Sequence, residues 1–120
     1  AYFHVLANLI AKETKSSMDD VKRMLVLQYG TPARGKDGKY AAVKVPKNTN
    51  IEDFYPYYKH IGTDDNGLDM YIFFKRTSEL NKDEMIRLID GTVDEAKTLN
   101  IETLPPDELA RMMNRYKEGV

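Results

Sequence analysis

The sequence predicts an α+β fold in which two N-terminal helices, a small antiparallel sheet and two C-terminal helices follow one another. Near both ends of the chain, apolar residues recur at spacings of three and four, which is typical of amphipathic helices. Between the ends, two short apolar segments are bounded by Pro, Gly and Asp, which is typical of strands joined by turns. The chain has 120 residues, 42% of them hydrophobic, which suits a single domain over 1–120 with one core.

The first two helices are predicted from their apolar spacing and their ends. The first is expected over Tyr2 to Glu13 and the second over Met18 to Tyr29. Ser17 is a good N-cap for the second helix, and Asp20 lies near the positive end of its dipole. Gly30 is expected to end that helix in a left-handed conformation. The apolar stripe of the first helix consists of Phe3, Leu6, Leu9 and Ile10.

A basic segment rich in Gly and Pro separates the second helix from the sheet. We expect a flexible loop over Thr31 to Lys39, with a tight turn at Asp37-Gly38. A strand is then expected from Lys39 to Val45. Because successive strand residues point to opposite faces, the alternation places on one face the residues Tyr40, Ala42 and Lys44.

The middle of the chain mixes helical and strand signals. A short helical turn is expected over Ile51 to Tyr55, and Pro56 interrupts it. We therefore expect Glu52 to Lys59 to be helical in pieces. A turn is expected over Thr63 to Gly67, and it leads into a second strand over Leu68 to Phe74.

Two helices complete the predicted fold. The longer one is expected over Lys82 to Leu99, with a capping box formed by Asn81 and Glu84. Asn100 is expected to adopt a left-handed conformation after this helix, and Pro106 suits the first turn of the last helix. The apolar residues of the last helix are Leu109, Met112, Met113 and Tyr116.

Composition excludes several classes of site. The chain has no cysteine, which excludes disulfides, thiolate zinc sites, iron–sulfur clusters and a cysteine nucleophile. No apolar run approaches the ~20 residues of a membrane span, and no signal peptide is visible. We therefore expect a cytoplasmic protein without a cofactor. Because the chain starts at Ala1 without a methionine, we also expect some residues to precede it.

Charge is distributed unevenly along the chain, although the net charge is only −1. Residues 21–47 hold seven basic residues and one acidic residue, and residues 77–120 hold six basic and ten acidic residues. Their net charges are therefore +6 and −4. Such a division indicates separate faces with separate partners.

The basic segment is the strongest functional signal. Arg34, Lys36 and Lys39 lie between two aromatic residues, Tyr29 and Tyr40. Basic side chains neutralise phosphates and aromatic rings stack on unpaired bases. This interleaving predicts a site for single-stranded nucleic acid, with Tyr40 stacking on a base.

Two other functions compete with this prediction. Asp64, Asp65 and Asp69 would suit a metal-dependent nuclease, because clustered carboxylates hold hard cations that activate water. The same residues also suit an ordinary turn. The first two helices resemble a helix-turn-helix regulator. However, Asp19 and Asp20 lie at the end of the second helix that would contact the bases, where they would repel phosphate. The sequence contains no enzyme signature, so we expect a non-enzymatic protein.

The order of elements resembles a known family. The segments that carry the resemblance are Tyr2–Glu13, Met18–Tyr29, Phe74–Leu80, Lys82–Leu99 and Ile101–Leu104. In this order, a strand ends in the segment Lys75-Arg76-Thr77-Ser78, and a long helix with an acidic residue near its start comes next. A short apolar segment follows that helix. The chain thereby resembles the phage recombination protein family NinB, also called Orf.

The resemblance implies a DNA-binding recombination mediator from a phage or prophage. It implies a homodimer that binds single-stranded DNA, contacts the host single-strand-binding protein and helps to load a recombinase or annealing partner. It also implies that Lys75 and Arg76 face the DNA, and that the β-rich N-terminal part of the family would precede Ala1.

Overall fold

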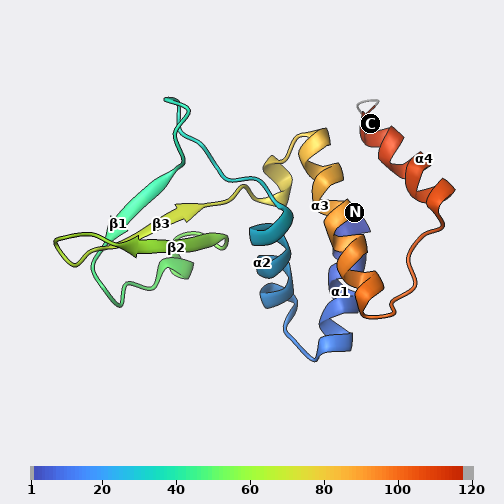
Figure 1. Ribbon diagram of the computed structural model, residues 1–120, viewed down its shortest axis with the longest axis horizontal. Helices are drawn as coiled ribbons and strands as arrows, with labels where there is room; N and C mark the ends of the chain where they lie inside the picture. Colours follow the sequence, from blue (N-terminus) through green and yellow to red (C-terminus); the bar gives the residue numbers. More distant parts are fainter. Residues whose placement is uncertain (1, 118–120) are drawn as a thin grey trace.

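A group of helices and a projecting antiparallel sheet make up the molecule (Figure 1), and the predicted α+β class is confirmed. The computed structural model describes residues 2–117, and the described part measures 53 × 36 × 20 Å. The helices are α1 (Tyr2–Thr14), α2 (Met18–Tyr29), α3 (Lys82–Thr98) and α4 (Pro106–Lys117), with short 3-10 turns η1 (Ile51–Asp53) and η2 (Thr77–Glu79). The strands are β1 (Ala42–Val45), β2 (Tyr58–Thr63) and β3 (Asp69–Phe73).

The hydrophobic core lies between α1, α2 and α3. Its most buried side chains are at most 1% exposed and include Phe3, Leu6, Leu25, Leu88 and Ile89. Leu9, which the sequence places in the apolar stripe of α1, is 38% exposed instead. Met113 of α4 joins this core, and the side chain of Tyr116 lies outside the described residues.

Local capping signals fix the starts of α2 and α3. The Ser17 side chain accepts a hydrogen bond from the Asp20 backbone N–H, at 3.0 Å. Asn81 and Glu84 form the predicted capping box. Asn100 has a φ of 59°, which confirms its left-handed conformation. Gly30 does not adopt the predicted left-handed conformation, because its φ is −81° and its ψ is −170°. The chain therefore leaves α2 in an extended conformation toward the sheet.

The sheet has three strands in the order β1-β3-β2, and β3 pairs antiparallel with both neighbours. The prediction of helical pieces over Glu52 to Lys59 is wrong beyond η1. Tyr58 and Lys59 pair with β3 instead, since Pro56 stops the helical turn and the extended chain gains hydrogen bonds to the central strand. A bulge interrupts the pairing of β2 between His60 and Gly62.

The two faces of the sheet are fixed by this register. The opposed residues Val43, Tyr71 and His60 share one face, which we call the inner face. Tyr71 contacts the rings of Tyr58 and His60 there. The neighbouring positions along each strand lie on the other, outer face. Among the residues described, no helix has the length and apolar character needed to cross a membrane.

Candidate nucleic-acid interface

The predicted basic loop is a hydrogen-bonded hairpin, which we call the basic finger (residues 33–41). The Ala41 N–H donates to the Ala33 carbonyl and the Gly35 N–H donates to the Lys39 carbonyl, both at 2.9 Å. The Ala33 N–H also donates to the Phe73 carbonyl of β3, at 2.8 Å. The loop predicted over Thr31 to Lys39 is therefore a paired hairpin, because the backbone here pairs with itself and with the sheet, and the predicted tight turn at Asp37-Gly38 is confirmed. β1 proper begins at Ala42 rather than Lys39.

Arg34 and Tyr40 face each other across the finger. The Arg34 guanidinium carbon lies 4.4 Å from the centre of the Tyr40 ring, which is a cation–π arrangement. The same guanidinium donates to the Gly38 carbonyl, at 2.7 Å. Tyr40 nevertheless keeps 51% of its surface exposed. The finger thus presents a positioned cation beside an accessible aromatic ring.

The tip of the finger adds two exposed cations, Lys36 and Lys39. Asp37 lies between them, and its carboxylate accepts the Lys39 backbone N–H at 3.0 Å. Asp37 therefore stabilises the turn. With three basic side chains and one acidic one, residues 34–39 carry a net charge of +2, which favours an anionic ligand.

Lys75 is engaged away from the finger. Its Nζ atom lies 3.0 and 3.2 Å from the two carboxylate oxygens of Glu84. Burial raises the pKa of Glu84, but the Asn81 backbone N–H and Lys75 outweigh that effect, and the net shift is downward. Because Glu84 is only 8% exposed, this pair ties the end of β3 to the start of α3.

Arg76 also contacts the fold around it. Its guanidinium carbon lies 4.9 Å from the centre of the Tyr55 ring. Its backbone N–H donates to Glu79 at 2.8 Å, and this bond is the largest cause of the lowered pKa of Glu79. The Tyr55 ring in turn packs against Phe73 on the inner face. The sequence-predicted cations therefore divide between the finger and the junction of sheet and helices.

Most tyrosines that follow the finger in sequence pack inside the fold. Tyr57 is buried in the core, and Tyr55 and Tyr58 are half-buried. Tyr58 packs between Tyr71 and the guanidinium of Arg23, which lies 4.2 Å from its ring centre. Tyr40 is the one sequence-predicted stacking residue, and it has the exposure that stacking requires.

Two of the three aspartates of the alternative nuclease site, Asp64 and Asp69, have other partners. Asp64 accepts the backbone N–H groups of Asn66 and Leu68, both at 2.9 Å, and the Leu68 bond is the largest cause of its lowered pKa. Asp69 accepts from the Thr63 hydroxyl at 3.0 Å. In the part of the chain that the structure describes, no three His, Cys, Asp or Glu residues are grouped to hold a metal ion. The turn interpretation therefore accounts for Asp64.

The helix-turn-helix alternative also loses support from the packing of α2. Arg23 on this helix donates to the Tyr58 carbonyl at 2.8 Å and covers the Tyr58 ring. Asp19 and Asp20 line a hollow together with Glu52, which lies between β1 and β2. The helix that would read bases therefore packs against the segment that leads into β2.

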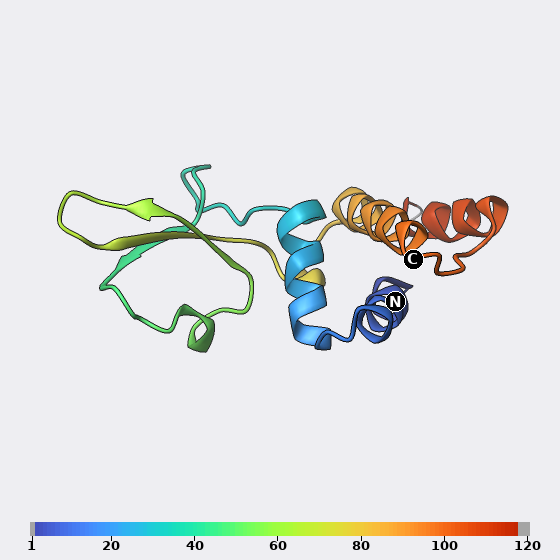
Figure 2. The same cartoon turned by 60° about the horizontal axis from the view of Figure 1, so that its bottom comes forward.

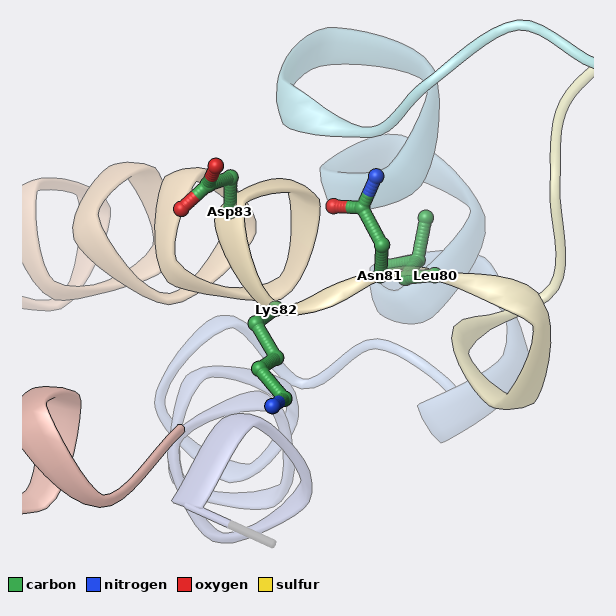
Figure 3. A pocket seen from close by; sticks show the side chains of 4 residues that line it. All are labelled: Leu80, Asn81, Lys82 and Asp83. Carbon is green, nitrogen blue, oxygen red and sulfur yellow. The ribbon is translucent and has the colours of Figure 1, made fainter. Parts of the chain in front are cut away.

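A hollow at the start of α3 offers no second candidate. It is lined by Leu80, Asn81, Lys82 and Asp83. Figure 3 shows that the Lys82 and Asp83 side chains point in different directions from the helix, so their charges do not converge on one ligand. Comparisons of the chain with protein-family models, curated proteins and solved structures give no match.

Proposed function

We propose that the protein binds single-stranded DNA through the basic finger and, in line with its resemblance to the NinB family, acts as a non-enzymatic phage or prophage recombination mediator in the host cytoplasm. The observation that carries the proposal is the Arg34–Tyr40 pair beside Lys36 and Lys39 on one hydrogen-bonded hairpin. The resemblance alone suggests the mediator role, the homodimer and the contact with the host single-strand-binding protein.

The chemistry of the finger matches the two exposed parts of a single strand. Arg34, Lys36 and Lys39 would each neutralise a phosphate, and the released counterions would supply most of the affinity. The accessible face of Tyr40 would stack on an unpaired base, which a duplex keeps inside its own stack. Because the finger is already hydrogen-bonded, little backbone entropy would be lost on binding.

Charge reversal of the finger tests this proposal. The variant Arg34→Glu, Lys36→Glu, Lys39→Glu should bind a labelled oligothymidylate more weakly in fluorescence anisotropy. Its plot of log affinity against log salt should flatten by about two units, since each lost phosphate contact removes about 0.7. Stability should change little, because exposed charges contribute little to it.

A matched control keeps the same number and type of charge changes. Arg87, Lys12 and Lys97 are exposed on the helices, and their replacement by Glu should leave the salt slope near its original value. If the finger variant folds and binds at low salt as tightly as the original protein, the finger is a solvated hairpin and the proposal fails.

Stacking by Tyr40 is tested separately from charge. Tyr40→Ala should weaken binding by about 1–3 kcal/mol for one stacked base, or roughly 5- to 150-fold. Tyr40→Phe keeps the ring and should bind nearly as the original does. Phe54, which is 72% exposed outside the finger, provides the control Phe54→Ala. If the Tyr40→Ala and Phe54→Ala variants bind the oligonucleotide with equal affinity, Tyr40 is not part of the DNA interface.

The mediator role needs its own assay. If the resemblance holds, the protein should speed the loading of a recombinase or annealing protein onto DNA coated with host single-strand-binding protein. The finger variant should lose this stimulation together with DNA binding. If saturating amounts of the protein do not change the rate of loading, the protein is not a loading mediator, although it can still bind DNA.

A further inference from the structure

The outer face of the sheet carries two lysines that face the same way. Lys59 on β2 pairs across β3 with Ile72, and Lys44 on β1 pairs with Met70. Residues 70 and 72 lie on one face of β3, so all four side chains share it. Two lysines from the outer strands therefore flank two apolar side chains of the central strand.

The inner face is covered in part by the segment around η1, although His60 on this face keeps 48% of its side chain exposed. The Tyr55 ring packs against Phe73 there, with 5.3 Å between ring centres, and Tyr58 packs against Tyr71. Ile51 of η1 is 4% exposed, so this turn is packed rather than free. Figure 2 shows η1 and the basic finger on opposite sides of the sheet. The outer face lies on the side from which the finger projects.

Exposure distinguishes the outer face further. The Lys44 side chain is 58% exposed, Lys59 is exposed and Met70 is half-buried, whereas the half-buried Ile72 also packs against the hydrophobic core. Tyr40 lies in the finger, two residues before β1, so Lys44 follows the finger directly along the chain. The outer face is thus continuous with the finger and has the same charge.

One acidic partner lies close to this face, and its contact is replaceable. The Lys44 Nζ atom is 3.4 Å from Asp64. Asp64 is held by backbone N–H groups of its own turn, so it keeps partners when Lys44 moves. Because the Lys44 side chain is 58% exposed and surface ion pairs contribute little free energy, Lys44 can exchange this carboxylate for a phosphate at small cost.

We propose that the outer face continues the single-strand interface, with Lys44 and Lys59 binding phosphates and with Met70, beside the exposed part of Ile72, as the apolar contact under the bases. The inference rests on the proposed function and extends it from the finger to the sheet. Strands lie about 4.8 Å apart and rise about 3.3 Å per residue. The two lysine Cα atoms are therefore about 12 Å apart, so the DNA would cross all three strands.

The test uses the neutral variant Lys44→Gln, Lys59→Gln beside the control Lys12→Gln, Lys97→Gln. Binding to a long oligothymidylate is measured by anisotropy from low to high salt. Two lost phosphate contacts should flatten the slope by about 1.4 units. The affinity ratio of original to variant should then change roughly 25-fold over a tenfold change in salt. The control should follow the original protein.

The outcomes separate the two proposals. If the finger variant loses binding while the Lys44/Lys59 variant matches its control, the extension is overturned and the proposed function stands. If neither variant differs from its control, both proposals fall. Equal binding of a blunt duplex and of the single strand, with equal losses in the Lys44/Lys59 variant, would overturn single-stranded DNA as the occupant of this face.

Discussion

Replacement of Gly91 by alanine should destabilise the protein, although alanine favours helices. Gly91 lies in α3 against the aromatic ring of Tyr29, which ends α2. An added Cβ at Gly91 would lie only 2.2 to 2.7 Å from three ring carbons of Tyr29. The ring cannot easily retreat, because its hydroxyl donates to Glu95 and accepts from Gln28. The hydrogen bond to Glu95 is the largest cause that raises the pKa of Tyr29 to about 12.

The size of the effect follows from two opposing contributions. An extra methyl group in a filled space costs about 1–3 kcal/mol, and the contacts at Gly91 place it in the upper part of that range. Replacing a glycine inside a helix by alanine stabilises the helix by up to about 1 kcal/mol. We therefore expect Gly91→Ala to lower the free energy of unfolding by about 2 kcal/mol.

A double-mutant cycle with Tyr29→Ala checks the cause. Without the ring, Gly91→Ala should stabilise the protein by about 0.5–1 kcal/mol, since only the helix propensity remains. Urea unfolding followed by circular dichroism measures all four proteins. Tyr29→Phe serves as a control that keeps the ring and removes the bond to Glu95. If Gly91→Ala stabilises the protein with and without the Tyr29 ring, the close packing of α2 and α3 is refuted.

Two further predictions concern pH and assembly. The pKa of Glu84 is lowered in the folded state from an ordinary value of 4.5. Its contribution to stability is therefore fully present above about pH 4.5 and is lost as the pH falls through the folded pKa. Glu84→Gln should flatten this acid dependence in thermal melts, and an unchanged pH profile would contradict the ion pair with Lys75. The homodimer that the resemblance implies remains a prediction, and Val5 and Leu9 on α1 are exposed apolar residues that such an interface would cover. Light scattering that finds a monomer at high micromolar concentration would contradict the dimer.

Signals carried by neighbouring residues predicted the helices well. Ser17 caps α2 through an N–H three residues away, and Asn81 and Glu84 cap α3 over the same distance. Such bonds can be inferred from spacing alone. The end of α2 was different, because Gly30 is extended and the chain continues toward Pro32, which bridges to Phe74. That long-range pairing is invisible in the local sequence.

The same difference between local signals and long-range contacts holds for the sheet and for the candidate site. β2 was missed because Tyr58 to Thr63 gains its strand geometry from pairing with β3, and its aromatic and proline neighbours favoured broken helix. Without β2 the register of Lys59 was unknown, so its place beside Lys44 could not be predicted. The resemblance implies that Lys75 faces DNA, but its ion pair with Glu84 could not be predicted, because Glu84 lies beyond a turn that folds back onto Lys75. The sequence singles out Arg34 and Tyr40 because basic and aromatic residues alternate in this segment, whereas their pairing across a hairpin was not predicted.

The elongated outline of the molecule has a consequence for the way it meets a polyanion. Residues 31–76, which include the sheet, hold eight basic and six acidic residues, whereas residues 77–117 hold six basic and nine acidic ones. The long dimension of 53 Å far exceeds the screening length of about 8 Å at physiological salt. A single strand of DNA that approaches the protein would therefore interact with the two ends separately. Its negative charge would orient the protein with the sheet toward the DNA before contact. Electrostatic steering of this kind would make the association rate fall with salt despite the net charge of −1. It would also leave α3 and α4 directed away from the DNA.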